Sequence, residues 1–382
     1  MEEVKKVDSG NMRDSGIELL KVIAILLIVI SHVVQTLSSE NPLIGYSDYI
    51  LDLSCATKEM QLVILMILRH FGAFGNSIFF ICSAWFLLDR KTVSVRKITE
   101  IMMDVWAISV LILAAVQIFM GGITFQLIVR SLLPTTFGNN WYLTCYILFY
   151  AVHTSLNKII WGMTQKQLLK AASVLAFLYI GCDFVKEDLF FPSFLILWGA
   201  IYFVIAYIKF YCKETFRSNK LNLILLTIGF LGMVAMVFLT NALGLKTPIF
   251  YDKTLKWAVN CNPFLILMAL SAFGLAKNFH FKNKLINHIS KLALLIYIIH
   301  ENILVRTYIR PLIWQWLYKQ VGYDHVVELA LAYAVVWFIL ALILSEAYKK
   351  TLQRVVQKLG AVVTTVVKDL YELYEHCMLK IS

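Results

Sequence analysis

Long apolar stretches alternate with short basic ones along most of this chain. The first stretch, residues 17–37, is 21 residues long, and about 20 apolar residues are enough for a helix to cross a bilayer. The sequence therefore predicts an all-α, polytopic integral membrane protein with about ten transmembrane helices. The ten predicted spans are 17–37, 72–88, 101–120, 141–157, 171–182, 192–210, 222–243, 262–277, 288–304 and 327–348.

The composition agrees with a lipid environment. Hydrophobic residues make up 60% of the chain and charged residues only 15%, whereas soluble domains carry about 25% charged residues. The net charge is +11, but the basic residues lie between the apolar stretches, where membrane topology places them. We therefore expect the lipid bilayer, and no nucleic acid, as the partner of these charges.

The basic residues also predict an orientation. With both termini in the cytoplasm, the inside pieces carry 24 of the 35 Lys and Arg residues and the outside pieces carry 10. This bias predicts a multi-pass membrane protein with its N- and C-termini inside. Residues 121–138 are apolar but short, which indicates a re-entrant or interfacial piece.

The chain divides into a transmembrane domain at 1–350 and a tail at 351–382. Apolar residues recur in the tail at steps of three and four, with Lys and Arg beside them. This pattern predicts an amphipathic helix on the cytoplasmic leaflet, and a simple stop-transfer anchor is the open alternative. The seven cysteines form no CxxC and no Cys/His spacing, so no metal site is expected.

Two polar side chains in the first predicted span are candidates for function, because titratable groups inside a membrane are costly. Lys21 and His32 are eleven residues apart. In a helix they project from one face, separated by about 16 Å along the axis. Each residue alone has a structural explanation, since Lys21 can reach the headgroups and His32 can lie at the interface. Their shared face favours a site or path through the bundle.

The predicted topology sorts the other polar residues by depth. We expect one set near the depth of His32, on the outer side: His70, Asn76, Asn140, Trp141, His300, Glu301 and Asn302. We expect a second set at or near the inner side: Lys21, Ser83, Arg90, Lys91, Arg96 and Lys97. Helix packing and interfacial anchoring are the competing explanations for several of them.

Four short motifs lie along the predicted spans in chain order: Lys21-x10-His32, Phe79-Phe80-Ile81-Cys82-Ser83-Ala84, Asn140-Trp141-Tyr142-Leu143 and Ile296-Tyr297-Ile298-Ile299-His300. Together they resemble the motifs of the membrane-bound acyltransferase 3 family. The run His300-Glu301-Asn302, followed by Arg306, is similar to the branch found with capsule and exopolysaccharide clusters of Gram-positive bacteria. The basic residue of the first motif is usually Arg in the family and is Lys here.

The resemblance implies a polysaccharide O-acetyltransferase of the bacterial cytoplasmic membrane that uses acetyl-CoA as acyl donor. The acceptor would be a hydroxyl of an extracytoplasmic polysaccharide or a lipid-linked sugar. His32 would act as general base, with Glu301 and His300 orienting it or binding the sugar. The expected donor-binding residues are Lys21, Ser83, Arg90, Arg96 and Lys97. The expected acceptor-binding residues are Asn76, Asn140, Trp141, Asn302 and Arg306.

Two other functions stay open on the sequence. A transporter or flippase for a lipid-linked glycan would also have about ten helices and an intramembrane histidine, and a non-catalytic component of a glycan assembly complex would share the topology. Transporters often carry internal repeats with broken helices at matching positions, and the sequence shows no such pair. A scaffold would not need Lys21 and His32 on one face.

Overall fold

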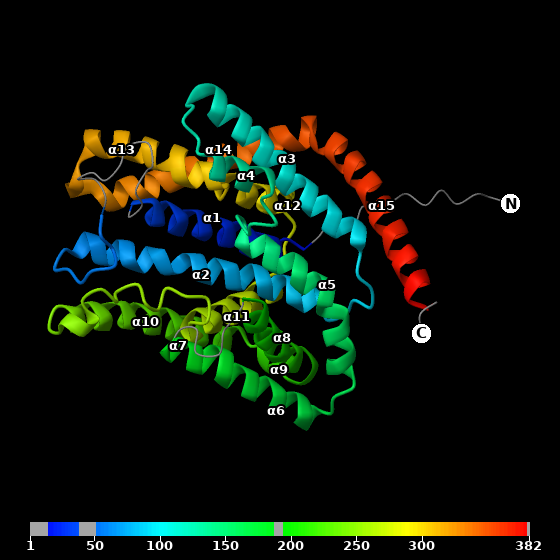
Figure 1. Cartoon of the computed structure of the whole chain (residues 1–382). Helices are drawn as coiled ribbons and strands as arrows, with labels where there is room; N and C mark the ends of the chain where they lie inside the picture. The colour runs from blue at the N-terminus through cyan, green and yellow to red at the C-terminus, as the bar shows by residue number, and fades with distance from the viewer. Residues whose placement is uncertain (1–13, 38–50, 187–193, 380–382) are drawn as a thin grey trace, which may run out of the picture.

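The computed structural model describes residues 14–37, 51–186 and 194–379, and within these ranges the chain is helical without a strand (Figure 1). The longer helices are α1 (Ser15–Leu37), α2 (Met60–Leu87), α3 (Val95–Phe119), α5 (Trp141–Trp161), α6 (Gln165–Ala176), α8 (Phe194–Tyr211), α10 (Asn219–Gly244), α11 (Pro263–Asn278), α12 (Lys284–His300), α13 (Arg310–Val321), α14 (Val326–Thr351) and α15 (Gln353–Leu379). The short pieces are α4 (Phe125–Leu132), η1 (Phe177–Cys182), α7 (Asp183–Val185), α9 (Lys213–Phe216), η2 (Pro248–Phe250), η3 (Val305–Ile309) and η4 (Tyr323–His325).

The predicted all-α, membrane-spanning fold is confirmed. Seven of the described helical segments are long and apolar enough to cross a membrane, or eight if the bent pair formed by α12 and residues 305–321 is one span. Each of the ten predicted spans lies on a helix, although α11 has only 16 residues. The number ten and the orientation stay predictions.

Helix α1 occupies the middle of the bundle and packs against α2, α11, α12 and α14 (Figure 1). Ala24, Ile25, Val29 and Val33 on this helix are fully buried. Protein rather than lipid therefore surrounds most of α1. That surrounding explains how a spanning helix can carry Glu18, Lys21 and His32, because neighbouring helices can supply partners for them.

Two glycines let α1 and α2 approach closely. A side chain at Gly75 would place its Cβ 2.7 Å from the backbone oxygen of Ala24, and one at Gly72 would meet the Ser31 hydroxyl oxygen at 2.5 Å. Small residues at such contacts are typical of helix pairs in membranes. The position of α1 relative to α2 therefore depends on these two residues having no side chain.

Two predicted connections, 38–71 and 305–326, contain long helical stretches, so the boundaries assigned to them were wrong. Helix α2 begins at Met60 rather than near 72, because residues 60–68 are apolar and Arg69 turns to Ser31 on α1 instead of ending the helix. At the other site, α12 ends at His300, and the predicted connection 305–326 holds η3 and α13. The two halves of this bent pair differ in direction by 66°.

Polar caps fix the ends of several helices. Ser94 accepts a hydrogen bond from the backbone of Lys97 and begins α3, while Thr164 and Gln167 form a reciprocal capping box on α6. Asn262, followed by Pro263, begins α11. Side-chain oxygens at these positions satisfy N–H groups that have no partner within the helix, so the chain specifies where the packed helices begin.

The C-terminal helix α15 begins after a break at Leu352 and packs along α3. Asp104 on α3 holds this corner, since it accepts hydrogen bonds from the Tyr348 hydroxyl at 2.8 Å and the Gln353 amide at 2.9 Å. Apolar side chains on another side of α15, including Val355, Leu359 and Val362, are exposed. Contact of this side with the cytoplasmic leaflet stays a prediction, as does the division of the chain at residue 350.

Candidate functional site

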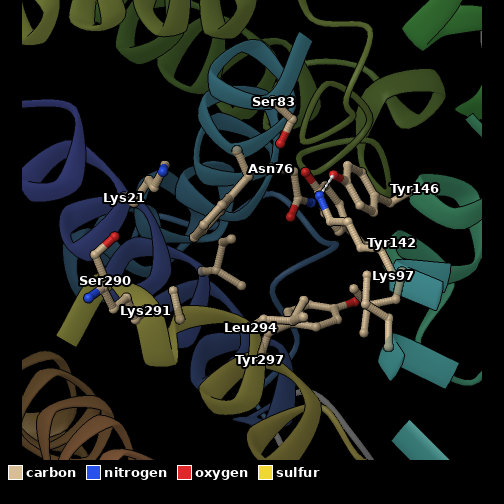
Figure 2. Close-up of a pocket in the computed structure, with 15 residues that line it drawn as sticks. Lys21, Asn76, Ser83, Lys97, Tyr142, Tyr146, Ser290, Lys291, Leu294 and Tyr297 are labelled. Carbon is tan, nitrogen blue, oxygen red and sulfur yellow. Dashed lines mark hydrogen bonds between the residues drawn. The ribbon is translucent and has the colours of Figure 1, made fainter. Parts of the chain in front are cut away.

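A basic hollow opens beside Lys21, between α1, α2, α3, α5 and α12. It consists of two cavities, of about 230 Å³ and about 370 Å³, that share the lining residues Lys21, Ser83, Lys97 and Tyr146. Figure 2 shows the first of them, with Lys21, Ser290 and Lys291 on one side and Lys97, Tyr142 and Tyr146 on the other. Five helices that are distant in sequence therefore contribute to one hollow.

Positive charge predominates in this basic hollow. Its charged lining residues are Lys21, Arg90, Lys97 and Lys291, all of them basic. Glu18 lies beside them and forms an ion pair with Lys21 at 3.3 Å, and it also accepts a hydrogen bond from Ser290. One carboxylate cannot neutralise four cations, so the hollow is suited to an anionic group such as a phosphate.

Tyrosines rather than carboxylates hold Lys97. Its ammonium nitrogen lies 3.4 Å from the Tyr146 hydroxyl and 4.8 Å from the centre of the Tyr150 ring, and the bond to Tyr146 is drawn in Figure 2. In the described part of the chain no carboxylate pairs with Lys97. Its full charge is therefore directed toward the hollow.

A compact histidine cluster, formed by His32, His300 and Glu301, lies next to the hollow. All three side chains are buried, with exposed fractions of 6%, 0% and 2%. The Nδ1 atom of His32 is 2.8 Å from a carboxylate oxygen of Glu301 and 3.1 Å from Nε2 of His300. The break after α12 places Glu301 against α1, because α12 ends at His300.

The hydrogen bonds of this histidine cluster assign its protons. His300 Nδ1 lies 2.8 Å from the carbonyl oxygen of Ile296, and a carbonyl can only accept, so His300 carries its proton there and Nε2 accepts. His32 must then donate from Nδ1 toward His300 and Glu301. This leaves the lone pair of His32 on Nε2, which is the form that a general base requires.

Tyr297 lies between the basic hollow and the histidine cluster. It lines the hollow (Figure 2), and its ring stands edge-on to that of His300, with 5.7 Å between ring centres. Ile28, on α1 between Lys21 and His32, lines the same hollow. The hollow thus runs along α1 from Lys21 toward His32, as expected for two side chains on one helix face.

Comparison with known families decides the identity of this arrangement. The acyltransferase 3 family, an acyltransferase domain, matches residues 14–347, which include the hollow and the histidine cluster. The chain belongs to the acyltransferase 3 family. The protein is therefore a membrane acyltransferase. No curated protein and no solved structure matches the chain.

Within this acyltransferase, the structure gathers most of the predicted inner residues. Lys21, Ser83, Arg90 and Lys97 all line the basic hollow. Arg96 does not, because its side chain is 72% exposed and pairs with Glu100 at 2.8 Å. Four of the five expected donor-binding residues therefore lie together, and Arg96 lies apart from them.

The predicted outer residues are more dispersed. Asn76 lines the hollow and donates to Asn260 at 3.3 Å, whereas Asn302 donates to Ser109 at 3.4 Å and lines neither cavity. Asn140 is buried where α5 begins, and Trp141 packs on Phe194. Arg306 pairs with Glu301 at 3.1 Å and joins the histidine cluster.

Several residues of the acyltransferase site were missed in the sequence. Tyr142, Tyr146 and Tyr150 follow one another at four-residue steps and all line the hollow, so their helical spacing was a usable signal. Arg69 was assigned to a loop, although it lies in α2 and donates to Ser31 at 2.9 Å. Tyr297 belongs to one of the four motifs, but no local pattern indicates that it lines the hollow, because that depends on how α12 packs.

The histidine cluster also has the composition of a metal site. His32, His300 and Glu301 each offer one ligand atom, and these atoms lie within 4.8 Å of one another. A guanidinium nitrogen of Arg310 lies 3.6 Å from the Glu301 carboxylate oxygen that faces His32. The positive charge of Arg310 would repel a metal ion at this position. The expectation of no metal stays a prediction, and the arrangement is better suited to proton transfer.

Proposed function

We propose that this membrane acyltransferase moves an acyl group, most simply acetyl, from acyl-CoA to a hydroxyl of an extracytoplasmic or lipid-linked polysaccharide. The observation that carries the proposal is the pairing of a basic hollow with a histidine whose Nε2 is free to accept a proton. The hollow suits the phosphates of CoA, and the histidine suits activation of a hydroxyl. The protein would work in the cytoplasmic membrane of a bacterium.

The donor would bind from the Lys21 end. Lys21, Arg90 and Lys97 would hold the CoA phosphates, while the narrow pantetheine arm would follow the hollow toward Tyr297. Lys21 and His32 are separated by about 16 Å of helix, a distance that an extended arm can bridge. The thioester would then lie near the histidine cluster, where the acceptor hydroxyl arrives from the outer side.

The chemistry would be a general-base transfer. His32 Nε2 takes the proton of the acceptor hydroxyl as its oxygen attacks the thioester carbonyl, and the carbon–sulfur bond then breaks. The proton passes from His32 to the departing sulfur, which leaves as the CoA thiol, and the acyl group stays on the acceptor as an ester. Glu301 would stabilise the imidazolium that forms between these steps, as the carboxylate does in a serine protease triad.

The test is O-acylation of the glycan made by producing cells, measured by NMR for wild type and His32→Ala at equal membrane levels. General-base catalysis typically contributes about 10²- to 10⁴-fold, so we expect the O-acyl signals to vanish while the polymer yield holds. His325→Ala is the matched control, because this histidine is exposed in η4.

The outcomes also separate the alternatives. Unchanged O-acylation in His32→Ala would refute the assignment of the base. Loss of the polymer itself would favour a flippase for a lipid-linked glycan, because the break between α12 and α13 is a feature that transporters share. A non-catalytic assembly component would tolerate the substitution without change in either measurement.

A further inference from the structure

Three arginines gather around the single carboxylate of Glu301. Arg306 lies 3.1 Å from one of its oxygens, and Arg310 lies 3.6 Å from the other. Arg69, from α2, donates to Ser31 beside His32 and is near enough for its charge to interact with that of Glu301. We call these three residues the arginine cluster. They come from two sides of α1 and meet at the histidine cluster.

The charges of this cluster do not balance within the described chain. Glu301 can neutralise one guanidinium, and both hydrogen-bonded histidines are neutral in the assignment above, so two positive charges are left over. Arg310 is 1% exposed, and its Nε and Nη1 atoms have no hydrogen-bond partner among the described residues. A buried charge that is only partly neutralised is costly, and an arriving anion would offset that cost.

The positions of the three arginines indicate where an anion would enter. The Arg306 side chain is 32% exposed, whereas that of Arg310 is buried beneath it. One guanidinium is enough to hold Glu301 in place, so that role does not explain why three arginines lie here. A guanidinium fork binds carboxylate and phosphate in a two-pronged manner, and such a ligand would lie next to His32.

We propose that the acceptor of this acyltransferase is anionic, and that its carboxylate or phosphate binds the arginine cluster beside the hydroxyl to be acylated. This inference rests on the proposed function. It adds that the site selects its acceptor by charge. The oxyanion would come either from an acidic sugar or from the diphosphate of a lipid carrier, and both offer the same fork of oxygens.

The experiment uses the full-length protein in proteoliposomes with acetyl-CoA and two pairs of acceptors. One pair is a uronic-acid oligosaccharide and its carboxyl-reduced form. The other is a neutral oligosaccharide with and without a polyprenyl diphosphate. Product formation gives a preference ratio for each pair, defined as kcat/KM for the anionic member over kcat/KM for the neutral member. A ratio is used because it cancels general losses of activity.

We expect a ratio of at least tenfold for one pair in the wild type, near one in Arg306→Gln, and partly restored in Arg306→Lys. Lys253→Gln, an exposed cation at a distant turn, should keep the wild-type ratio. The pair that shows the preference identifies the source of the oxyanion. Ratios near one for both pairs, with transfer intact, would overturn this inference alone. Absence of transfer to every acceptor would overturn the proposed function.

Discussion

Among single residues, the cations near the Lys21 end of α1 differ in what they can contact. Arg96 and Lys97 are adjacent in sequence, yet Lys97 lines the basic hollow while Arg96 pairs with Glu100 on the surface. Helix geometry explains this, because consecutive residues on a helix point about 100° apart. Substituting each of these two neighbours separately can therefore distinguish a specific contact in the hollow from the effect of general surface charge.

We predict that Lys97→Gln raises the KM for acyl-CoA about tenfold, since one lost contact to a phosphate is worth about 1.4 kcal/mol or more. Arg96→Gln should leave KM unchanged, because an exposed pair contributes little. Initial rates in proteoliposomes at fixed acceptor and varied donor give both constants. Equal increases for the two variants would mean that surface charge, rather than the hollow, attracts the donor.

Sequence reasoning identified the residue pair Lys21 and His32 because the period of a helix is fixed, so a spacing of eleven implies a shared face. It could not identify Tyr297 or Arg69. The role of Tyr297 depends on α12 packing against α5, and Arg69 became part of the site only because α2 begins at Met60, which places Arg69 within the helix. Both facts arise from packing between distant segments, which one sequence read locally does not contain.

Among the helices, the contact of α1 with α2 determines where His32 lies. Gly75 allows this contact, since any Cβ there would be 2.7 Å from a backbone oxygen of α1. Backbone cannot move aside as a flexible side chain can. A substitution at Gly75 must therefore separate the two helices, and α1 carries both Lys21 and His32.

We predict that Gly75→Ala destabilises the protein by about 1–3 kcal/mol, the usual cost of overpacking, and lowers acyl transfer. Gly199→Ala in α8 is the control, because a Cβ there meets nothing within 4 Å and alanine favours the helix by about 0.5–1 kcal/mol. Thermal unfolding in detergent, followed by activity at a temperature where both variants stay folded, separates the two effects. A Gly75→Ala protein as stable and active as Gly199→Ala would contradict the close packing.

The helices themselves were largely predictable, because length and hydropathy are local properties. All ten expected spans fall on helices, and the sequence-based boundaries failed mainly at α2 and at the bend after His300. Hydropathy misled at α2 because Arg69 is polar but partnered within the bundle. It misled at α13 because the chain bends by 66° after His300. A bend of this kind has the same polar sequence pattern as a connection between two helices.

For the whole molecule, the distribution of Lys and Arg predicts both termini in the cytoplasm. We therefore expect full-length protein with green fluorescent protein fused after residue 382 to fluoresce, and the same fusion to alkaline phosphatase to be inactive. An epitope inserted between Asp252 and Lys253, an exposed turn, should be labelled on intact cells. Phosphatase activity at the C-terminus, or an epitope reached only after lysis, would reverse the orientation.

The separation of the basic hollow from the histidine cluster has an electrical consequence if this orientation holds. Each turnover would take a proton from a hydroxyl at the outer face and leave it on the CoA thiol on the cytoplasmic side, while the acyl group moves outward without the electron pair of its bond to sulfur. One positive charge would therefore move inward and one outward, so the net transfer is electroneutral. A membrane potential does work only on charge that crosses the membrane. Glycan acylation would then draw on the thioester alone and proceed equally well in an energised and a de-energised membrane.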